Sequence, residues 1–73
     1  MNKDNVWELI VAIMGEDVYI TTFIYEHEST AKRTFYSFID GKHADYYCDI
    51  RGYDVLTYND HSMRIKLANR LIG

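Results

Sequence analysis

"VWELIVAIMGEDVYITTFIYE", residues 6–26, contains two runs of β-branched and aromatic residues that are separated by the three residues Gly-Glu-Asp. Such residues favour extended backbone, so residues 6–14 and 18–26 are predicted to form two strands. Gly15, between the runs, can adopt the positive φ that a tight turn needs. We therefore expect a β-hairpin in this part of the chain.

Both faces of this predicted hairpin are apolar. In the second run one face carries Val18, Ile20 and Ile24 and the other Tyr19, Phe23 and Tyr25, and in the first run Trp7, Leu9, Val11 and Ile13 alternate with Ile10, Ala12 and Met14. An antiparallel sheet with one side in water usually alternates apolar and polar residues. The pattern indicates that both faces are covered, by a helix on each or by one helix and a partner. If the end of the chain does not cover the second face, we expect a homodimer.

The next segment, "HESTAKRTFYSFIDGK" (27–42), has the period of a helix. Its apolar side chains fall on one helical stripe, which consists of Ala31, Phe35, Phe38 and Ile39. Ser29 or Thr30 is expected to cap the N-terminus of this helix, and Gly41 is expected to end it in the left-handed conformation.

Two further extended segments follow, on either side of Gly52. "ADYYCDIR" (44–51) alternates, which places Tyr46, Cys48 and Ile50 on a predicted buried face and Tyr47, Asp49 and Arg51 on an outward face. "YDVLTY" (53–58) resumes the extended pattern. Gly52 marks either a hairpin turn or a bend in one long strand.

The last segment, "NDHSMRIKLANRLIG" (59–73), has two possible periods. Met63, Leu67 and Leu71 share a helical stripe behind the capping residues Asn59 and Asp60, which favours a helix. Because Met63 and Leu67 also alternate with Ile65 between them, an edge strand is the alternative. The chain is therefore predicted to be one α+β domain, residues 1–73. Its order is ββαβ(β)α, with a small antiparallel sheet of three to four strands and one or two helices packed on it.

The composition of the chain indicates the cellular compartment and the classes of partner that we expect. It has 73 residues, a net charge of −3 and one cysteine, Cys48, which excludes an internal disulfide. A lone free thiol is typical of cytoplasmic proteins, and we expect that compartment. The apolar run 6–14 is too short to span a bilayer, so no membrane contact is expected. The acidic balance argues against non-specific binding to nucleic acid.

The side chains that could hold a metal or act as nucleophiles lack the necessary spacing. His27, His43, His61 and Cys48 form no C-x₂-C, H-x₃-H or H-E-x-x-H pattern, so no metal or other cofactor is expected. In a strand, His43 and Cys48 would lie on opposite faces, which argues against a Cys–His pair. No phosphate-binding glycine loop is present. We therefore expect a protein that is not an enzyme.

Acidic residues and tyrosines alternate along residues 45–60, where Arg51 is the one basic residue. Tyrosine provides a large contact area with a polar tip, which is why it concentrates at interfaces. We predict that this segment binds a partner protein through Asp45, Tyr47, Asp49, Arg51, Tyr53 and Tyr58. The alternative that these tyrosines only cover the edge of the core stays open.

Basic residues gather in the C-terminal segment. On the predicted helix, Arg64, Lys66 and Arg70 would contact phosphates and Asn69 would contact a base. A small nucleic-acid-binding regulator is therefore the alternative function. Three basic residues in a chain of net charge −3 form a weak footprint, so we favour the protein-binding hypothesis.

The size of the chain, the segment "FIYEHESTAKRTFYSFIDGK" after a hairpin, and the acidic tyrosine-containing stretches resemble a general class of proteins. These are small phage-encoded proteins that bind and inhibit host factors, such as anti-CRISPR and anti-restriction proteins. The resemblance carries no motif, so it assigns no role to any residue. The resemblance implies a single α+β domain that binds and inhibits a host or phage protein.

Overall fold

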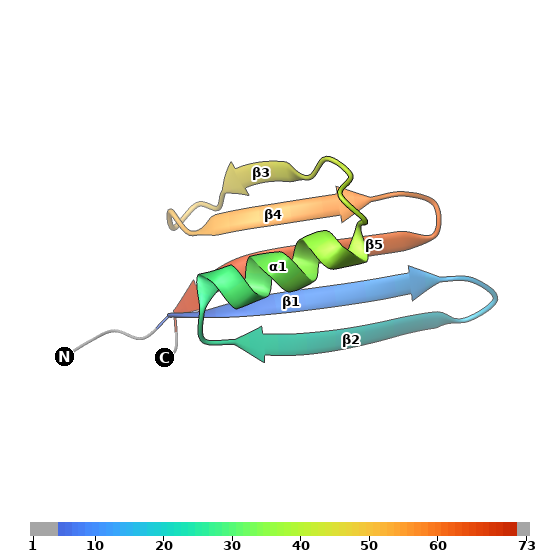
Figure 1. The fold of residues 1–73 in the computed structure, drawn as a ribbon, viewed down its shortest axis with the longest axis horizontal. Coiled ribbons are helices and arrows are strands. Elements are labelled where there is room, and N and C mark those ends of the chain that lie inside the picture. Colours follow the sequence, from blue (N-terminus) through green and yellow to red (C-terminus); the bar gives the residue numbers. More distant parts are fainter. Residues whose placement is uncertain (1–4, 72–73) are drawn as a thin grey trace.

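A computed structural model describes residues 5–71, and within them five strands and one helix. The elements are β1 (Asn5–Met14), β2 (Val18–Tyr25), α1 (Glu28–Phe38), β3 (Asp45–Cys48), β4 (Asp54–Asn59) and β5 (Met63–Leu71). The strands form one antiparallel sheet in the order β2-β1-β5-β4-β3, and α1 lies across one side of it (Figure 1). The predicted α+β class, the hairpin and the helix are confirmed. The sheet is larger than predicted.

The register places the first and last strands side by side at the centre of the sheet. β1 pairs with β2 from Trp7↔Tyr25 to Met14↔Val18, and on its other side it pairs with β5. Leu9↔Leu67 lies in the middle of the β1–β5 pairing. β2 and β3 are therefore the two edges of the sheet.

The hydrophobic core lies between α1 and the sheet. Opposed residues in antiparallel strands point to the same side, so the register assigns each side chain to a face. The core residues are Trp7, Leu9, Val11, Ala31, Phe35, Ile39, Leu56, Ile65 and Leu67. Phe35, Leu9, Ile39 and Leu67 are the largest fully buried ones. Burial of each such side chain contributes about 1.5–3 kcal/mol, which makes this layer the main source of stability.

The ends of α1 differ in part from the prediction. The residue that caps its N-terminus is His27, not Ser29 or Thr30, and its side chain makes no capping hydrogen bond. At the C-terminus Asp40 and Gly41 both have positive φ, and the Gly41 N–H donates to the Tyr36 carbonyl at 3.3 Å. This bond is that of a Schellman cap, in which Asp40 is the left-handed residue directly after the C-cap Ile39. The left-handed φ predicted for Gly41 is confirmed, but Gly41 is the second residue after the cap and not the first.

Phe38 does not belong to the buried stripe of the helix. Its side chain is 39% exposed, whereas Ala31, Phe35 and Ile39 are buried. Spacings of four keep those three residues in line, and Phe38 falls beside that line.

The predicted C-terminal helix is wrong, and the strand alternative describes the segment. β5 alternates as the sequence allowed, with Ile65 and Leu67 in the core, but it is a central strand and not an edge. Asp60, interpreted as a helix cap, instead caps the β4–β5 turn. Its Oδ1 accepts hydrogen bonds from the N–H groups of Ser62 and Met63, both at 2.8 Å. Capping residues bind free N–H groups in turns as well as at helix starts, so this signal was ambiguous.

The prediction that Tyr46, Cys48 and Ile50 face the core is also wrong. Tyr46 is 60% exposed, Cys48 is exposed, and Ile50 lies fully exposed in the turn after β3. β3 is the outermost strand, and α1 packs on β1, β5 and β2, so the core does not extend to it. Gly52 has a φ of 92° in a hairpin turn between β3 and β4, which selects the hairpin over the bent strand.

Candidate functional site

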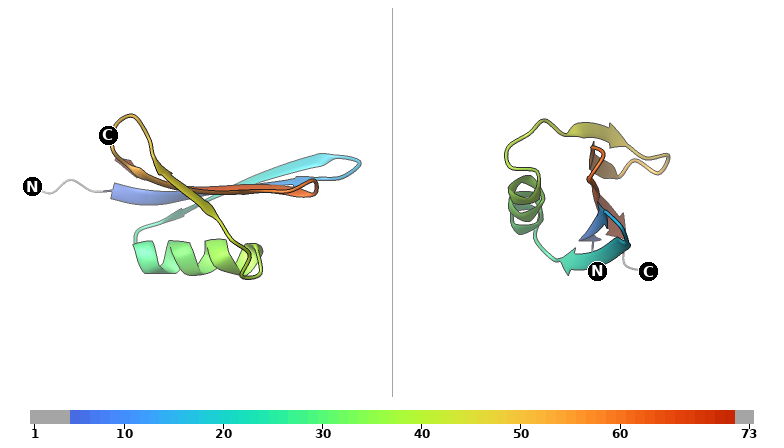
Figure 2. Two further views of the ribbon diagram at one scale, coloured as in Figure 1. Left: turned by 90° about the horizontal axis from the view of Figure 1, so that it is seen from above. Right: turned by 90° about the vertical axis from the view of Figure 1, so that its right-hand side faces the viewer.

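One side of the sheet, which we call the open face, points away from α1. Figure 2 shows the helix on a single side of the sheet, and within residues 5–71 no other element lies over the open face. The register assigns to it Val6, Glu8, Ile10, Ala12, Met14, Val18, Ile20, Thr22, Ile24, Asp45, Tyr47, Val55, Thr57, Asn59, Arg64, Lys66, Ala68 and Arg70. Because residues 63–71 form a strand, no helix is left in the described chain to cover this face.

The part of the open face on β2 and β1 is apolar. Ile20 is 67% exposed and Ile24 is 57% exposed, and Val18 is similar. Beside them, Ile10 and Ala12 are half-buried and line one wall of a shallow depression of about 240 Å³. Its other wall is formed by Thr57, Asn59, Arg64 and Lys66. An exposed apolar area with a polar rim is typical of an interaction surface.

A row of basic side chains runs along β5 through the middle of the open face. Arg70 Nε donates to Glu8 Oε1 at 3.0 Å, and this pair is partly shielded from water. Within the described residues, no carboxylate lies within ion-pair distance of Arg64 or Lys66. The centre of the open face therefore carries two cations without a countercharge, next to apolar side chains.

The acidic, tyrosine-containing segment lies at the β3 edge of the open face and in the turn that follows it. Asp45 and Tyr47 are on the open face. In the turn, Asp49 Oδ1 accepts the N–H groups of Arg51 at 2.8 Å and Tyr53 at 3.0 Å, and Asp49 Oδ2 accepts Arg51 Nη2 at 3.3 Å. The Arg51 guanidinium also lies over the Tyr53 ring, 5.6 Å from its centroid.

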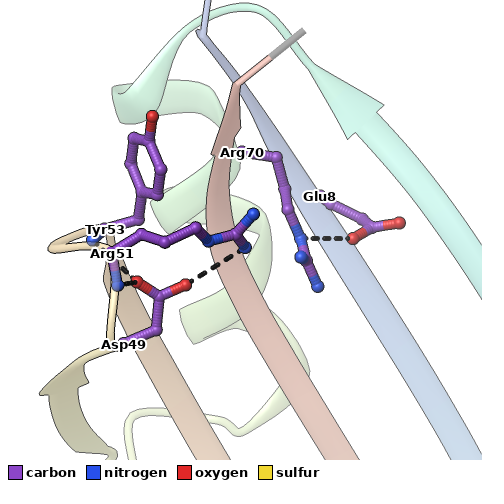
Figure 3. A network of polar contacts seen from close by, with 5 residues as sticks. All are labelled: Glu8, Asp49, Arg51, Tyr53 and Arg70. Atoms are coloured by element: carbon purple, nitrogen blue, oxygen red, sulfur yellow. Dashed lines mark hydrogen bonds and ion pairs between the residues drawn. The ribbon is translucent and has the colours of Figure 1, made fainter. Parts of the chain in front are cut away.

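Figure 3 shows α1 behind the strands, with the Asp49–Arg51 and Glu8–Arg70 pairs in front of them. The hydrogen bond from the Tyr53 N–H is the main cause that lowers the pKa of Asp49. Asp49 thus holds the turn together through its carboxylate, so it is a structural residue more than a free contact. Arg51 and Tyr53 are held in place by the same turn.

Tyr58 and Asn69 lie on the side of the sheet that faces α1. Tyr58 is thereby separated from the other predicted protein-binding residues, and Asn69 from the other predicted nucleic-acid-binding residues. Tyr58 pairs with Ile65 and packs against the core, and its hydroxyl donates to Asp60 Oδ2 at 2.8 Å. This bond raises the pKa of Tyr58 and lowers that of Asp60. Asn69 pairs with Trp7, and its Oδ1 is buried without a hydrogen-bond partner in the described chain. The remaining members of both predicted sets share the open face or the turn beside it.

A cluster that the sequence did not indicate lies on β3 and β4, on the α1 side beyond the helix. Tyr46 Oη donates to Asp54 Oδ1 at 2.7 Å and lies 3.2 Å from Cys48 Sγ. The bond with Cys48, followed by the bond to Asp54, raises the pKa of Tyr46. In the described chain Cys48 contacts no histidine or cation, the neighbours that favour a reactive thiolate. The cross-strand pairing Cys48↔Asp54 that forms this cluster is not visible from sequence spacing.

Within residues 5–71, no group of three His, Cys, Asp or Glu side chains converges as a metal ion would require. α1, the one helix of that range, is not long and apolar enough to cross a membrane.

Comparison of the chain with protein-family models, with curated proteins and with solved structures finds no match.

Proposed function

We propose that this protein is a non-enzymatic, cytoplasmic binding module that docks its open face onto a partner protein and so blocks or regulates it. The observation that carries the proposal is the exposure of Ile20 and Ile24 on the same open face as Arg64 and Lys66, one strand away from them. Within residues 5–71 these two cations have no ion-pair partner and no element covers the face. The general resemblance of the sequence to small phage-encoded inhibitors supports a host factor or defence protein as the target.

The chemistry of the open face defines the partner surface that fits it. Apolar area at the centre of an interface supplies most of the affinity, and charges set orientation and rate of association. The apolar hairpin and the adjacent cations match a partner patch that is apolar and has carboxylates along one side. Tyr47 and Tyr53 would supply contacts at the rim.

This proposal moves the binding surface relative to the one predicted from sequence. Asp49 is committed to the turn, and Tyr58 faces away, so the acidic segment contributes Asp45, Tyr47, Arg51 and Tyr53 at the rim. The centre of the site shifts to β1, β2 and β5.

A capture experiment with charge reversal tests the proposal. The tagged protein is used to capture partners from a lysate of the native host, and the captured protein is then purified and titrated directly. The variant with Arg64→Glu and Lys66→Glu should lose binding, because the partner's carboxylates would then face like charges. Arg33→Glu, on the exposed surface of α1, is the matched control and should bind as the parent does. Equal binding by both variants would rule out the open face.

Nucleic-acid binding is the second candidate, and one observation favours it: Arg64, Lys66 and Arg70 form a row on one face. Against it, the open face of β1, β5 and β4 carries no aromatic side chain on which a base could stack, and Glu8 already neutralises Arg70. Fluorescence anisotropy with a labelled oligonucleotide over a salt series separates the two candidates. Salt-dependent binding that collapses in Arg64→Glu would favour nucleic acid.

A further inference from the structure

β2 is an edge strand whose side chains are exposed on both faces of the sheet. Its inner side pairs with β1, and within the described residues no strand lies on its outer side. Seven of its eight residues are exposed, all except Tyr25. Its outward-pointing main-chain N–H and C=O groups are therefore available to another strand.

The sequence of β2 lacks the features that normally keep an edge strand unpaired. "VYITTFIY" contains no charged residue, no proline and no glycine, and it is rich in residues that favour strands. Edge strands that remain solitary are usually short, carry lysine or proline, or are interrupted by a bulge. β2 is continuous over its eight residues and pairs with β1 without interruption.

We infer that β2 pairs with β2 of a second copy of this chain, antiparallel and about a two-fold axis perpendicular to the sheet, so that the two sheets join into one. This axis keeps α1 of both copies on the same side of the joined sheet. Each β2 residue is therefore paired with a residue whose side chain points to the same side of the sheet. An axis at Thr21 or Thr22 pairs seven of the eight residues of β2, and an axis at any other residue pairs fewer.

The residue that comes opposite Val18 selects Thr21. With Thr21 on the axis, every residue from Val18 to Ile24 opposes an uncharged residue of β2: Val18 opposes Ile24, Tyr19 opposes Phe23 and Ile20 opposes Thr22. Glu16 and Asp17 belong to the β1–β2 turn and lie outside the paired strands. With Thr22 on the axis, Val18 opposes Glu26, which leaves that carboxylate against an apolar side chain. Apolar and aromatic pairs stabilise adjacent strands, and an unmatched charge does not.

Charge also favours the edge over the open face as the contact between copies. Two stacked open faces would bring Arg64 and Lys66 of one copy against the same cations of the other, whereas β2 is uncharged. Pairing through β2 leaves both open faces free and side by side on one surface. The inference therefore goes beyond the proposed function, and it is tested without the partner.

Light scattering and sedimentation velocity of the purified chain over a micromolar concentration range test the dimer. We expect a reversible dimer. Ile20→Lys, which adds two lysines next to the axis, should weaken dimerisation roughly tenfold or more. Ile50→Lys places the same change in the fully exposed β3–β4 turn and should leave the dimer intact. A monomer at every concentration, or equal dimerisation of both variants, would overturn the inference.

Disulfide cross-linking tests the register and does not depend on the lysine variant. Thr21→Cys and Thr22→Cys are each made with Cys48→Ser, which removes the native thiol. Two residues on the axis oppose each other directly, within disulfide range, but those one position away are diagonal neighbours and too distant. Rapid oxidation to a covalent dimer is expected for Thr21→Cys alone. Cross-linking of Thr22→Cys alone, or of neither variant, contradicts the inference.

Discussion

The two edges of the sheet are built differently. β2 presents eight uncharged residues, and its side chains are exposed on both faces. β3 has four residues, contains Asp45, and ends at a turn that is fastened by Asp49. Short length and charge keep a strand from pairing with other chains, so β3 is protected and β2 is not. The comparison indicates that the β3 edge is suited to remain unpaired, whereas the β2 edge is suited to pair with another strand.

The largest expected effect is the loss of stability when a core side chain that supports both edges is removed. Phe35→Ala removes a fully buried ring beneath β1 and β5 and should cost about 3–5 kcal/mol of unfolding free energy. A chain of this length has only about 4–11 kcal/mol in total, so both edges should unfold together. Phe38→Ala, at a partly exposed site on the same helix, should cost less than about 1 kcal/mol. Urea denaturation followed by circular dichroism measures both, and equal costs would contradict the assigned core.

Asp49→Ala tests whether the β3 edge depends on its turn. The variant removes the acceptor for the N–H groups of Arg51 and Tyr53, so these two amides should exchange with solvent faster while β1 amides stay protected. Amide hydrogen exchange followed by NMR gives both rates. Asp45→Ala, on the same edge but outside the turn, is the control. Unchanged exchange at Arg51 and Tyr53 would show that Asp49 does not hold the turn.

The same carboxylate predicts a pH dependence. Because the folded state lowers the pKa of Asp49, its stabilising contribution is present above the unfolded pKa of about 3.9 and is lost as the pH falls below that value. Asp60, whose pKa is lowered by the Tyr58 hydroxyl and then by the Ser62 N–H, adds to the loss in the same window. Thermal unfolding between pH 6 and pH 2 should therefore show a shallower acid decline in Asp49→Ala than in the parent. Parallel declines would contradict this assignment.

A smaller effect concerns the tyrosine on the protected edge. Bonds with Cys48 and Asp54 raise the pKa of Tyr46, so its folded form keeps the proton at pH values where an unfolded tyrosine, with a pKa of about 10, has lost it. That contribution to stability is lost as the pH rises above the unfolded pKa. Absorbance of tyrosinate during an alkaline titration should show two late-ionising tyrosines, Tyr46 and Tyr58, and Tyr46→Phe should remove one of them. Tyr19→Phe, on the unprotected edge, should leave both late-ionising tyrosines in place.

The smallest expected effect is that of removing the charge from β3, which tests whether the short length of this strand is enough to keep it from pairing with other chains. Asp45→Thr removes the charged residue of β3 but leaves the strand at four residues. We expect no new association in light scattering, because four residues provide few main-chain bonds and β2 remains the longer edge. Formation of higher oligomers or fibres would show that charge alone protects β3.

The local sequence was sufficient to predict those elements whose residue pattern had a single interpretation. The hairpin over β1 and β2 followed from two runs of β-branched and aromatic residues around Gly15. The helix α1 followed from the stripe of Ala31, Phe35, Phe38 and Ile39, of which Phe38 is partly exposed. For residues 63–71 two periods coexisted, and the choice depended on pairing with β1 and β4, which lie far away in the sequence. A strand between two others satisfies its main chain on both sides, and this tertiary effect is stronger than the local preference for helix.

The candidate site was predictable in its residue types but not in its arrangement. Arg64 and Lys66 were identified as basic contacts on a helix, and β5 instead places them on the open face next to Ile10 and Ala12. The role of Asp49 in the turn required a hairpin at Gly52, which the sequence left open. The burial expected for Tyr46 and Cys48 failed because alternation shows which residues share a face but not whether that face is covered.

Amide hydrogen exchange of the parent protein at high and low concentration tests the central claim most directly, because it reports on both edges in one experiment. The amides of β2 that point away from β1 should be protected at high concentration and lose that protection on dilution or in Ile20→Lys. The outward amides of β3 should exchange fast under every condition. Fast exchange of the outward β2 amides at all concentrations would contradict the pairing of β2 with a second copy.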